Sequence, residues 1–508
     1  MVEEFNSIYI YHLKGNARTS GEQRRKEKDN VFGEGSRAPV AIVFLVKNPA
    51  SKEKGKIYFH SVDDYLTREQ KLKEVSDFGS IANMTWEEII PDKHGDWLNQ
   101  KDDSFEKYIS IIDKANSHTP AIFKDYAVGI STNRDAWVYN SSKTDLKKNL
   151  DRTIKSYNTA VDRVKNGEAV SNVISSTTND IAWTVGSKSK FSQLIKQNFD
   201  ENNIIEGMYR PFNKQNLYYE KNPFFVERPG RWSDLLPTKK DTINRIITIN
   251  QRGGTSEEFN AIMTDKFCDL HFNGDSQCFS RYIYVEVNGK FEIKDAINDN
   301  ALEHFRLAYN NVEISKDDIF YYIYGILHSL EYRAKYENNL AKELPRIPRV
   351  ATHEQFKSFT EAGRKLAELH VNYESQPEYS DVTIKGEETR NYYVNQMKWG
   401  KIAGKTGNAS KDKTILIYND DITISNIPLE ALEYVVNKKS ALDWIVERAC
   451  VSTDKKSGIT NDFNQYGIEQ GNPRYPLSLF LRVITVSLET MKIVKSLPKL
   501  EIHPLDKE

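Results

Sequence analysis

Apolar and polar positions repeat with two different periods along the chain, and the change of period divides it into regions. Runs of β-branched and aromatic residues at 8–11 and 40–46 have turn formers on either side, which is typical of strands buried on both faces. We expect these two strands to lie inside one sheet. The segment 56–60 is short and apolar enough to add an edge strand to it.

Helical periodicity begins near Thr67, where Thr-Arg-Glu-Gln forms a capping box, and it predominates to about residue 190. Its clearest stripe runs from Asp145 to Lys165, where apolar residues recur every three or four positions. From 204 to about 287 short β-rich segments replace it, broken by Pro, Gly and Asn. Helices are predicted again from Ser315, at 361–374, at 440–450 and at 477–495, with a hairpin at 414–424.

The loop between the first two strands is strongly cationic and also carries the apolar residues Val31 and Phe32. Cationic side chains can contact the phosphates of a polyanion, and an aromatic ring can stack on its flat part. The alternative stays open, in which neighbouring acids neutralise the bases and Phe32 turns back into the core. The cationic residues are Arg18, Arg24, Arg25, Lys26 and Arg37.

Aromatic residues and arginines are interleaved in the β-rich region. Arginine offers paired donors that match guanine edges, and amides match adenine, so these residues are candidates for reading bases. An ordinary β-domain with an aromatic core shows the same alternation, and this alternative stays open for each residue. The candidates are Tyr209, Arg210, Arg228, Arg231, Trp232, Arg252, Asn273 and Gln277, with Arg134 as a further phosphate contact.

Composition narrows the class of protein. The 71 basic residues nearly balance the 72 acidic ones, so any contact with nucleic acid depends on local clustering of charge. Three cysteines in 508 residues do not form a disulfide framework and indicate a reducing cytoplasm. No apolar run reaches the length of a membrane span, and no signal peptide is recognisable. We therefore expect a cytoplasmic protein without a membrane partner.

The sequence gives no catalytic or metal-binding set. Asn222 to Phe225, NPFF, resembles the catalytic tetrapeptide NPPY of amino-methyltransferases, but it lacks the second proline and follows the opening strands. Cys268, His271 and Cys278 lack a fourth ligand at standard spacing, which favours buried thiols over a zinc site. No Gly-rich loop follows a strand near the start of the chain. We therefore predict no catalytic residue, no metal and no cofactor for this chain alone.

Several segments resemble one known family. LKGN, NVF, a Gly-Ser-Arg turn and PVAIVFLVKNP follow one another as at the end of the catalytic domain of γ-class adenine-N6 DNA methyltransferases. The version they most resemble is that of Type ISP restriction-modification enzymes, which join nuclease, translocase, methyltransferase and target-recognition domains. The likeness continues through GISTNRDAWVYN, ERPGRWSDLLP, TDKFCDLHFNGDSQCF and GNPRYPLSLFLRVITVSLETM.

The resemblance implies an α+β fold in four parts. Residues 1–61 would be the last strands of a Rossmann-like methyltransferase sheet and 62–200 a helical spacer. Residues 201–425 would form a mixed, β-rich and helical target-recognition domain, and 426–508 its C-terminal helical part. Phe32 would stack on a flipped adenine.

The resemblance also implies a function in phage defence. The chain would recognise a double-stranded DNA sequence and position an adenine for N6 methylation, or license ATP-dependent cleavage. The methyltransferase, helicase and nuclease domains would be its partners, in the same or an adjoining polypeptide. S-adenosylmethionine, ATP and Mg²⁺ would act in the full-length family.

Two other functions stay open. One is a self-sufficient adenine-specific methyltransferase, which needs a methyl-donor pocket. The other is a protein-interaction scaffold whose aromatic clusters dock translocase domains. Stabilisation by S-adenosylmethionine would favour the first, and failure to bind duplex DNA would favour the second.

Overall fold

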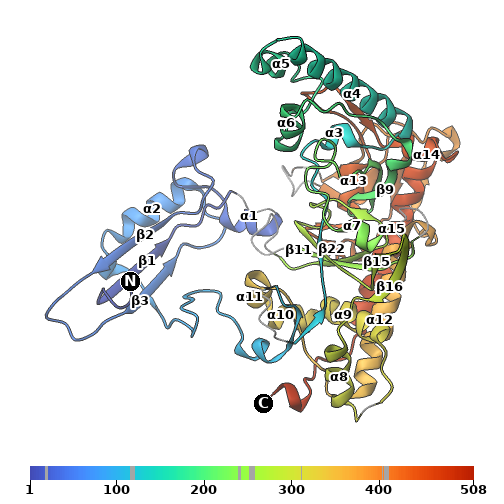
Figure 1. Cartoon of the computed structure of the whole chain (residues 1–508). Helices are drawn as coiled ribbons and strands as arrows, with labels where there is room; N and C mark the ends of the chain where they lie inside the picture. Colours follow the sequence, from blue (N-terminus) through green and yellow to red (C-terminus); the bar gives the residue numbers. More distant parts are fainter. Residues whose placement is uncertain are drawn as a thin grey trace. The chain divides into compact units, whose positions relative to one another are not determined.

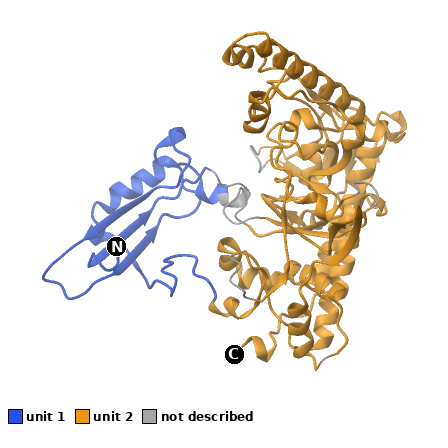
Figure 2. Cartoon of the chain, in the orientation of Figure 1, with its two compact units in different colours: residues 1–102 blue, residues 103–508 orange. Residues whose placement is uncertain are grey.

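The computed structural model describes residues 1–17, 21–114, 120–237, 242–250, 258–310, 312–402, 404 and 411–507, without the side chains of 21–23. The chain forms two compact units, Met1–Asp102 and Asp103–Glu508 (Figure 2). Helices and strands occur together in a mixed α+β arrangement, as predicted (Figure 1). Among the described helices, none is long and apolar enough to cross a membrane.

Unit 1 is built on one sheet in the order β2, β1, β3, β4. The central strand β1 (Ser7–His12) pairs antiparallel with β2 (Ala41–Val46) and parallel with β3 (Lys56–Ser61). β4 (Glu87–Ile89) pairs with the far side of β3. β1 and β2 therefore lie in one sheet, as predicted. Two other predictions were wrong: β3 lies inside the sheet and not at its edge, and β2, expected to be buried on both faces, is largely exposed. The sequence shows that both faces of β2 are apolar, but not whether a neighbouring strand is present.

Helix α2 (Arg68–Phe78) covers one face of this sheet. It begins at the predicted capping box, in which Thr67 and Gln70 exchange hydrogen bonds. Tyr11 in β1 packs edge-on against Phe78, 5.9 Å between ring centres, and its hydroxyl donates to Glu74, 2.9 Å away. The short helix α1 (Gly21–Glu27) lies in the loop between β1 and β2.

Two four-stranded sheets form the middle of unit 2. Strands far apart in the sequence are neighbours in both of them. The first sheet has the order β13 (Phe267–Cys268), β9 (Ile204–Arg210), β10 (Asn213–Tyr218), β8 (Tyr139–Asn140). The second has the order β12 (Ala261–Thr264), β11 (Ile246–Asn250), β14 (Ser276–Ser280), β7 (Ala127–Val128).

Unit 2 has further sheets besides these two. One has the order β17 (Arg346–Ile347), β5 (Ile109–Ile112), β6 (Ala121–Phe123), and another has β18 (Thr383–Lys385), β21 (Thr423–Ser425), β20 (Lys411–Ile417), β19 (Lys398–Lys401). The two-stranded pairs are β15 (Tyr282–Val287) with β16 (Lys290–Asp295), β22 (Val435–Val436) with β23 (Lys439–Ser440), and β24 (Val451–Thr453) with β25 (Thr460–Asp462).

The helices of unit 2 fall into two groups. The first group, with α4 and α15 as its long members, packs on the first sheet. It comprises α3 (Asp135–Val138), α4 (Lys143–Lys165), α5 (Val170–Ser176), α6 (Val185–Ser192), α7 (Trp232–Leu235), α13 (Ala441–Arg448), α14 (Asn464–Ile468) and α15 (Tyr475–Lys495). The second comprises α8 (Asp299–Ala308), α9 (Lys316–His328), α10 (Leu330–Lys335), α11 (Glu337–Lys342) and α12 (His353–Val371).

Most of the predicted helices and the predicted hairpin are present. α4, α9, α13 and α15 lie where the apolar stripes predict them, and β20 pairs with β21. Helix α12 starts earlier than predicted because Thr352 and Gln355 form a capping box. The prediction of helix between residues 79 and 134 was wrong, since this part contains β4 to β7. Those strands are short, and so they give too little alternation to be recognised.

Candidate nucleic-acid interface

In unit 1, Phe32 stands on a loop that is tightly held. Its side chain is 71% exposed. The amide of Asn30 donates to Gly15 O and Ala38 O, at 3.0 and 2.7 Å, and its oxygen accepts from the backbone N–H of Phe32 at 2.9 Å. The alternative in which Phe32 turns back into the core is therefore wrong. Its stacking on a flipped base stays a prediction.

Residues of helix α2 also hold this loop in place by hydrogen bonds. Lys71 is fully buried, and its ammonium donates to Glu27 O at 2.8 Å and Asp29 O at 2.6 Å. Burial lowers the pKa of Lys71. Arg68 Nε adds a hydrogen bond to Val31 O, 2.9 Å long. The loop is thus fixed on both sides of Asn30, which limits the positions that the Phe32 ring can take.

The basic residues predicted to contact phosphate in unit 1 lie on this loop. Arg24, Arg25 and Lys26 form the last turn of α1, and Lys26 lies 3.8 Å from Asp64. Arg37 is exposed and has no ion pair with any described residue. Arg18 lies outside the described residues. A role in phosphate contact stays a prediction for all of them.

In unit 2, three segments that resemble the family meet at one place. Ser131 and Arg228 exchange two backbone hydrogen bonds, 3.1 and 2.8 Å long. Ile130 N–H donates to Cys268 O at 2.8 Å and its carbonyl accepts from Leu270 N–H at 2.7 Å. We call residues 128–131, 228–231 and 268–271 the junction. The junction brings GISTNRDAW, ERPGRW and DLHFNGD side by side.

Two of the predicted base contacts are exposed at or beside the junction. Arg228 is exposed, and its side chain has no ion pair with a described residue. Arg231 has 53% of its side chain exposed and forms ion pairs with Asp125 and, at 3.0 Å, with Asp234. Arg228 is therefore the freer of the two to contact a ligand.

Tyr209 and Arg210 are engaged with each other and with a buried acid. The Arg210 guanidinium lies 4.0 Å from the centre of the Tyr209 ring and pairs with Asp269 at 2.7 Å. Burial raises the pKa of Asp269, although Arg210 opposes this. Because breaking such a pair leaves a buried charge, Arg210 is bound to the protein rather than available to a base.

Three other candidates are buried, and we do not propose them as base contacts. Trp232, Asn273 and Gln277 are at most 1% exposed. The Trp232 indole donates to Val128 O at 2.9 Å, and the Asn273 amide donates to Thr248 O at 3.1 Å. The polar groups of Trp232 and Asn273 thus satisfy buried backbone carbonyls, whereas the Gln277 side-chain oxygen accepts from Lys114. Arg252 lies outside the described residues.

Arg134 is not placed to contact phosphate. It is 4% exposed, its guanidinium lies 4.5 Å from the centre of the Phe224 ring, and it donates to Phe224 O and, at 3.2 Å, to Thr153. Burial lowers its pKa to about 9. The prediction was wrong because the aromatic residues around it close over the side chain.

A cleft of about 700 Å³ opens at the junction, and Ser131, Asp269 and His271 are among its lining residues. His271 on its wall lies 2.8 Å from Asp275, a contact that raises the pKa of the imidazole. Lys456 lies on the turn between β24 and β25, where the Ser457 hydroxyl and the charge of Lys456 both lower the pKa of Asp454. The lining offers hydrogen-bond donors and acceptors, and includes Ser131, Asn133, Trp137, Trp183, His271 and Lys456.

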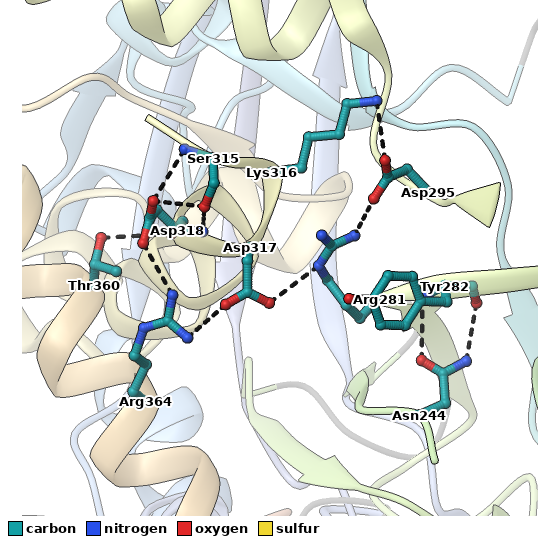
Figure 3. A network of polar contacts seen from close by, with 10 residues as sticks. All are labelled: Asn244, Arg281, Tyr282, Asp295, Ser315, Lys316, Asp317, Asp318, Thr360 and Arg364. Atoms are coloured by element: carbon teal, nitrogen blue, oxygen red, sulfur yellow. Dashed lines mark hydrogen bonds and ion pairs between the residues drawn. The ribbon is translucent and has the colours of Figure 1, made fainter. Parts of the chain in front are cut away.

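Many cations of unit 2 are neutralised by acids. Figure 3 shows the clearest case, where Arg281, Arg364 and Lys316 share three aspartates between α9, α12 and the β15–β16 hairpin. Arg281 Nη1 lies 2.5 Å from Asp295, and Arg364 Nη1 lies 2.6 Å from Asp317. Such networks hold elements together and leave little charge for a polyanion. Cations without an acidic partner are therefore the better candidates for contact with a polyanion.

The cysteines and NPFF are parts of the core. Cys268 and Cys278 are fully buried free thiols with sulfurs 3.7 Å apart, and burial raises the pKa of Cys268. No cluster of three metal-binding side chains occurs in the part of the chain that the structure describes. Phe224 of NPFF is buried against Tyr157, 4.4 Å between ring centres.

A family model now matches most of unit 2. The model is described as the Type ISP C-terminal specificity domain, and it matches residues 121–479. The chain belongs to this family. No curated protein matches the chain.

Three solved Type ISP or DNA-bound structures are similar over 99% of this chain. A nuclease-deletion mutant of the Type ISP restriction-modification enzyme LlaGI, in complex with a DNA substrate mimic, is 38% identical, with a TM-score of 0.83 and 44% of its chain covered. The ATP-dependent Type ISP enzyme LlaBIII bound to DNA is 32% identical, with a TM-score of 0.84 and 31% covered. The DrdV–DNA complex is 29% identical, with a TM-score of 0.83 and 48% covered. The chain thus spans less than half the length of each of these relatives.

The Type ISP match begins at residue 121, and unit 1 ends at Asp102. Unit 1 therefore precedes the specificity domain as the family model defines it. The four domain boundaries drawn from the sequence stay a prediction.

Sequence reasoning missed three exposed lysines of unit 2, Lys114, Lys124 and Lys456. Lys114 follows β5 and Lys124 follows β6, in the part expected to be helical. The β-branched run Ile109–Ile112 was the signal that could have placed Lys114 at the end of a strand.

Proposed function

We propose that this chain recognises a double-stranded DNA sequence as the specificity part of a Type ISP restriction-modification enzyme. In this role it holds an asymmetric site so that a target adenine is N6-methylated, or so that ATP-dependent cleavage of unmodified DNA begins. The observation that carries the proposal is the family match over residues 121–479, together with similarity to DNA-bound relatives over 99% of the chain.

The distribution of charge supports this proposal. The chain carries a net charge of −1, so it has no general attraction for DNA. Exposed Arg228 at the junction and Arg37 on the Phe32 loop are free of described acidic partners. Arginine at the junction is suited to bidentate contact with guanine, and the cations around it to phosphate.

We further propose that unit 1 completes a methyltransferase sheet with a part of a longer polypeptide. Its edge strand β2 exposes Val43, Phe44, Leu45 and Val46, each between 39% and 47%. An edge with two apolar faces suits a further strand and a cover. Phe32 would then reach a flipped adenine. S-adenosylmethionine, ATP and Mg²⁺ would bind to other parts of that polypeptide, since no Gly-rich phosphate loop or catalytic tetrapeptide is recognisable here.

Selection from a randomised duplex library tests the specificity. The 508-residue chain is incubated with about 40-bp duplexes that carry a randomised centre, and the bound fraction is sequenced. We expect enrichment of one asymmetric sequence. Arg228→Ala should relax the preference at one position by roughly 1–3 kcal/mol, whereas Arg25→Ala should weaken binding to every sequence alike.

Binding without enrichment would reduce the chain to a non-specific DNA-binding protein. Absence of binding would favour the interaction scaffold instead. A thermal-shift titration with S-adenosylmethionine addresses the self-sufficient methyltransferase, because clear stabilisation requires a methyl-donor pocket in this chain.

A further inference from the structure

Lys114 is held in place by uncharged groups. Its ammonium donates to the side-chain oxygen of Gln277 at 2.6 Å and lies 4.4 Å from the centre of the Tyr126 ring. Partial burial lowers its pKa, and no acid contributes to this shift. The described residues thus supply no negative charge to Lys114. An exposed lysine without a partner is usually mobile, whereas Gln277 and Tyr126 hold this one in place.

Gln277 is a rigid support for this cation. It is 1% exposed and lies in the middle of β14, paired with Ile249 of β11 on one side and Val128 of β7 on the other. The sequence suggested that Gln277 itself reads a base. In the structure its oxygen instead orients the ammonium of Lys114, so less side-chain entropy is lost when the ammonium meets a ligand.

A short stretch of chain, residues 124–131, connects Lys114 to other cations. Tyr126, whose ring contacts the Lys114 ammonium, follows Asp125 in the sequence. Asp125 forms an ion pair with Arg231. Three residues beyond β7, Ser131 is paired with Arg228. Lys124 at the start of the stretch is exposed and donates to a backbone carbonyl, Asp295 O, at 3.0 Å. We call Lys114, Lys124, Arg228 and Arg231 the basic edge.

The charge of the basic edge suits a DNA strand, which carries one phosphate about every 3.4 Å. Two of the four cations of the basic edge, Lys114 and Arg228, have no carboxylate partner among the residues that the structure describes, so their charge is available to phosphates. Lys124 also acts on the carboxylate of Asp299.

We propose that Lys114 contacts a DNA backbone phosphate and that Gln277 and Tyr126 are its positioning residues. This inference rests on the proposed function and assigns its phosphate contact to the basic edge. Lysine acts here as a compact point charge, which suits a phosphate better than a base edge. The contact would be the same on every sequence.

The test is fluorescence anisotropy of the whole chain with a labelled 30-bp duplex of mixed sequence, at several salt concentrations. By counterion release, Lys114→Gln should reduce the slope of log K against log [salt] by about 0.9 and weaken binding about 8-fold at ~0.1 M salt. Lys114→Arg should retain the slope. Gln277→Glu should mimic Lys114→Gln, because a carboxylate at this position pairs with the ammonium.

Lys492→Gln is the matched control. Lys492 is exposed on α15 and pairs with Glu489, so its removal changes the net charge equally and should leave the slope unchanged. An unaltered slope in Lys114→Gln, with normal binding by the parent chain, would overturn this inference and leave the proposed function intact. Equal losses in Lys114→Gln and Lys492→Gln would also overturn it. A parent chain that binds no duplex would overturn both.

Discussion

At the scale of the residue, the sequence indicates chemistry but not access. Arg134, Arg210 and Arg228 have the same side chain and similar aromatic neighbours in the sequence, yet only Arg228 is exposed. Whether an arginine is buried depends on contacts between distant segments, such as that of Arg134 with Phe224. The loop of unit 1 that carries Phe32 and Arg37 could be located because it lies between two recognisable strands, and the roles of its residues stay predictions.

Histidine 370 is the residue whose burial has the clearest consequence for pH. It is 2% exposed, its ring lies 2.5 Å from the Tyr324 hydroxyl and 3.0 Å from the Thr490 hydroxyl, and burial together with Arg333 lowers its pKa to about 3. His304 behaves alike, with a pKa lowered to about 4 by burial.

We expect the melting temperature to fall between pH 7.5 and pH 5.5. Below about pH 6.5 these two histidines bind protons in the unfolded chain but stay neutral in the folded chain, so stability present at neutral pH is lost. The loss is at most about 1.4 kcal/mol per pH unit for each histidine. The raised pKa values of His271 and Asp269 oppose it. Calorimetry at both pH values should show a smaller fall for His370→Gln, and an equal fall in both proteins would contradict this assignment.

At the scale of the element, long periodic helices and caps could be predicted, and short strands could not. The stripe of α4 and the box at Ser315 suffice because the information is local. β7 and β13 have two residues each, and only their partners make them strands. The junction therefore could not be predicted, although each of its three segments could be singled out.

Helices α9 and α12 cross closely at two glycines. A Cβ on Gly363 would lie 1.9 Å from Tyr321 O, and one on Gly325 would lie 2.2 Å from Phe359 O. These neighbours are backbone atoms of helices and cannot rotate away. The helix propensity gained from alanine, about 1 kcal/mol, is therefore outweighed by the clash.

Gly363→Ala should lower the free energy of unfolding of unit 2 by roughly 1–3 kcal/mol or more, which is the cost of overpacking. The melting temperature of unit 2 should fall as a result. Lys365→Ala, on the exposed side of the same helix, changes the propensity without the clash and should leave the melting temperature within about 1 °C, as a surface substitution does. Calorimetry compares the two. Equal melting temperatures for both variants would mean that the helices can separate at little cost.

At the scale of the whole molecule, the fold class and family could be predicted from segments spread along the chain. Which of the opening strands forms the edge of the sheet could not. The apolar residues of β2 show that both its faces need to be covered, and only the coordinates show that β2 has a single neighbouring strand in unit 1.

We expect the isolated chain to self-associate through β2 as its concentration rises. Val43→Lys combined with Leu45→Lys places two charges on one face of the edge and should keep the protein monomeric. Val285→Lys, on the exposed hairpin strand β15, is the control and should not alter association. Light scattering after size-exclusion chromatography measures the mass. A monomeric parent at high concentration would show that the edge is inert.

The same edge has a consequence for how binding data are interpreted. Two copies that pair antiparallel through β2 are related by a twofold axis. Such a pair would present its two DNA-reading surfaces in opposite directions along a duplex. It would therefore favour inverted repeats. A palindrome recovered from a selection at high protein concentration would then report the pairing of two chains, and only dilution or the doubly charged edge variant would reveal the one-sided site that a single chain prefers.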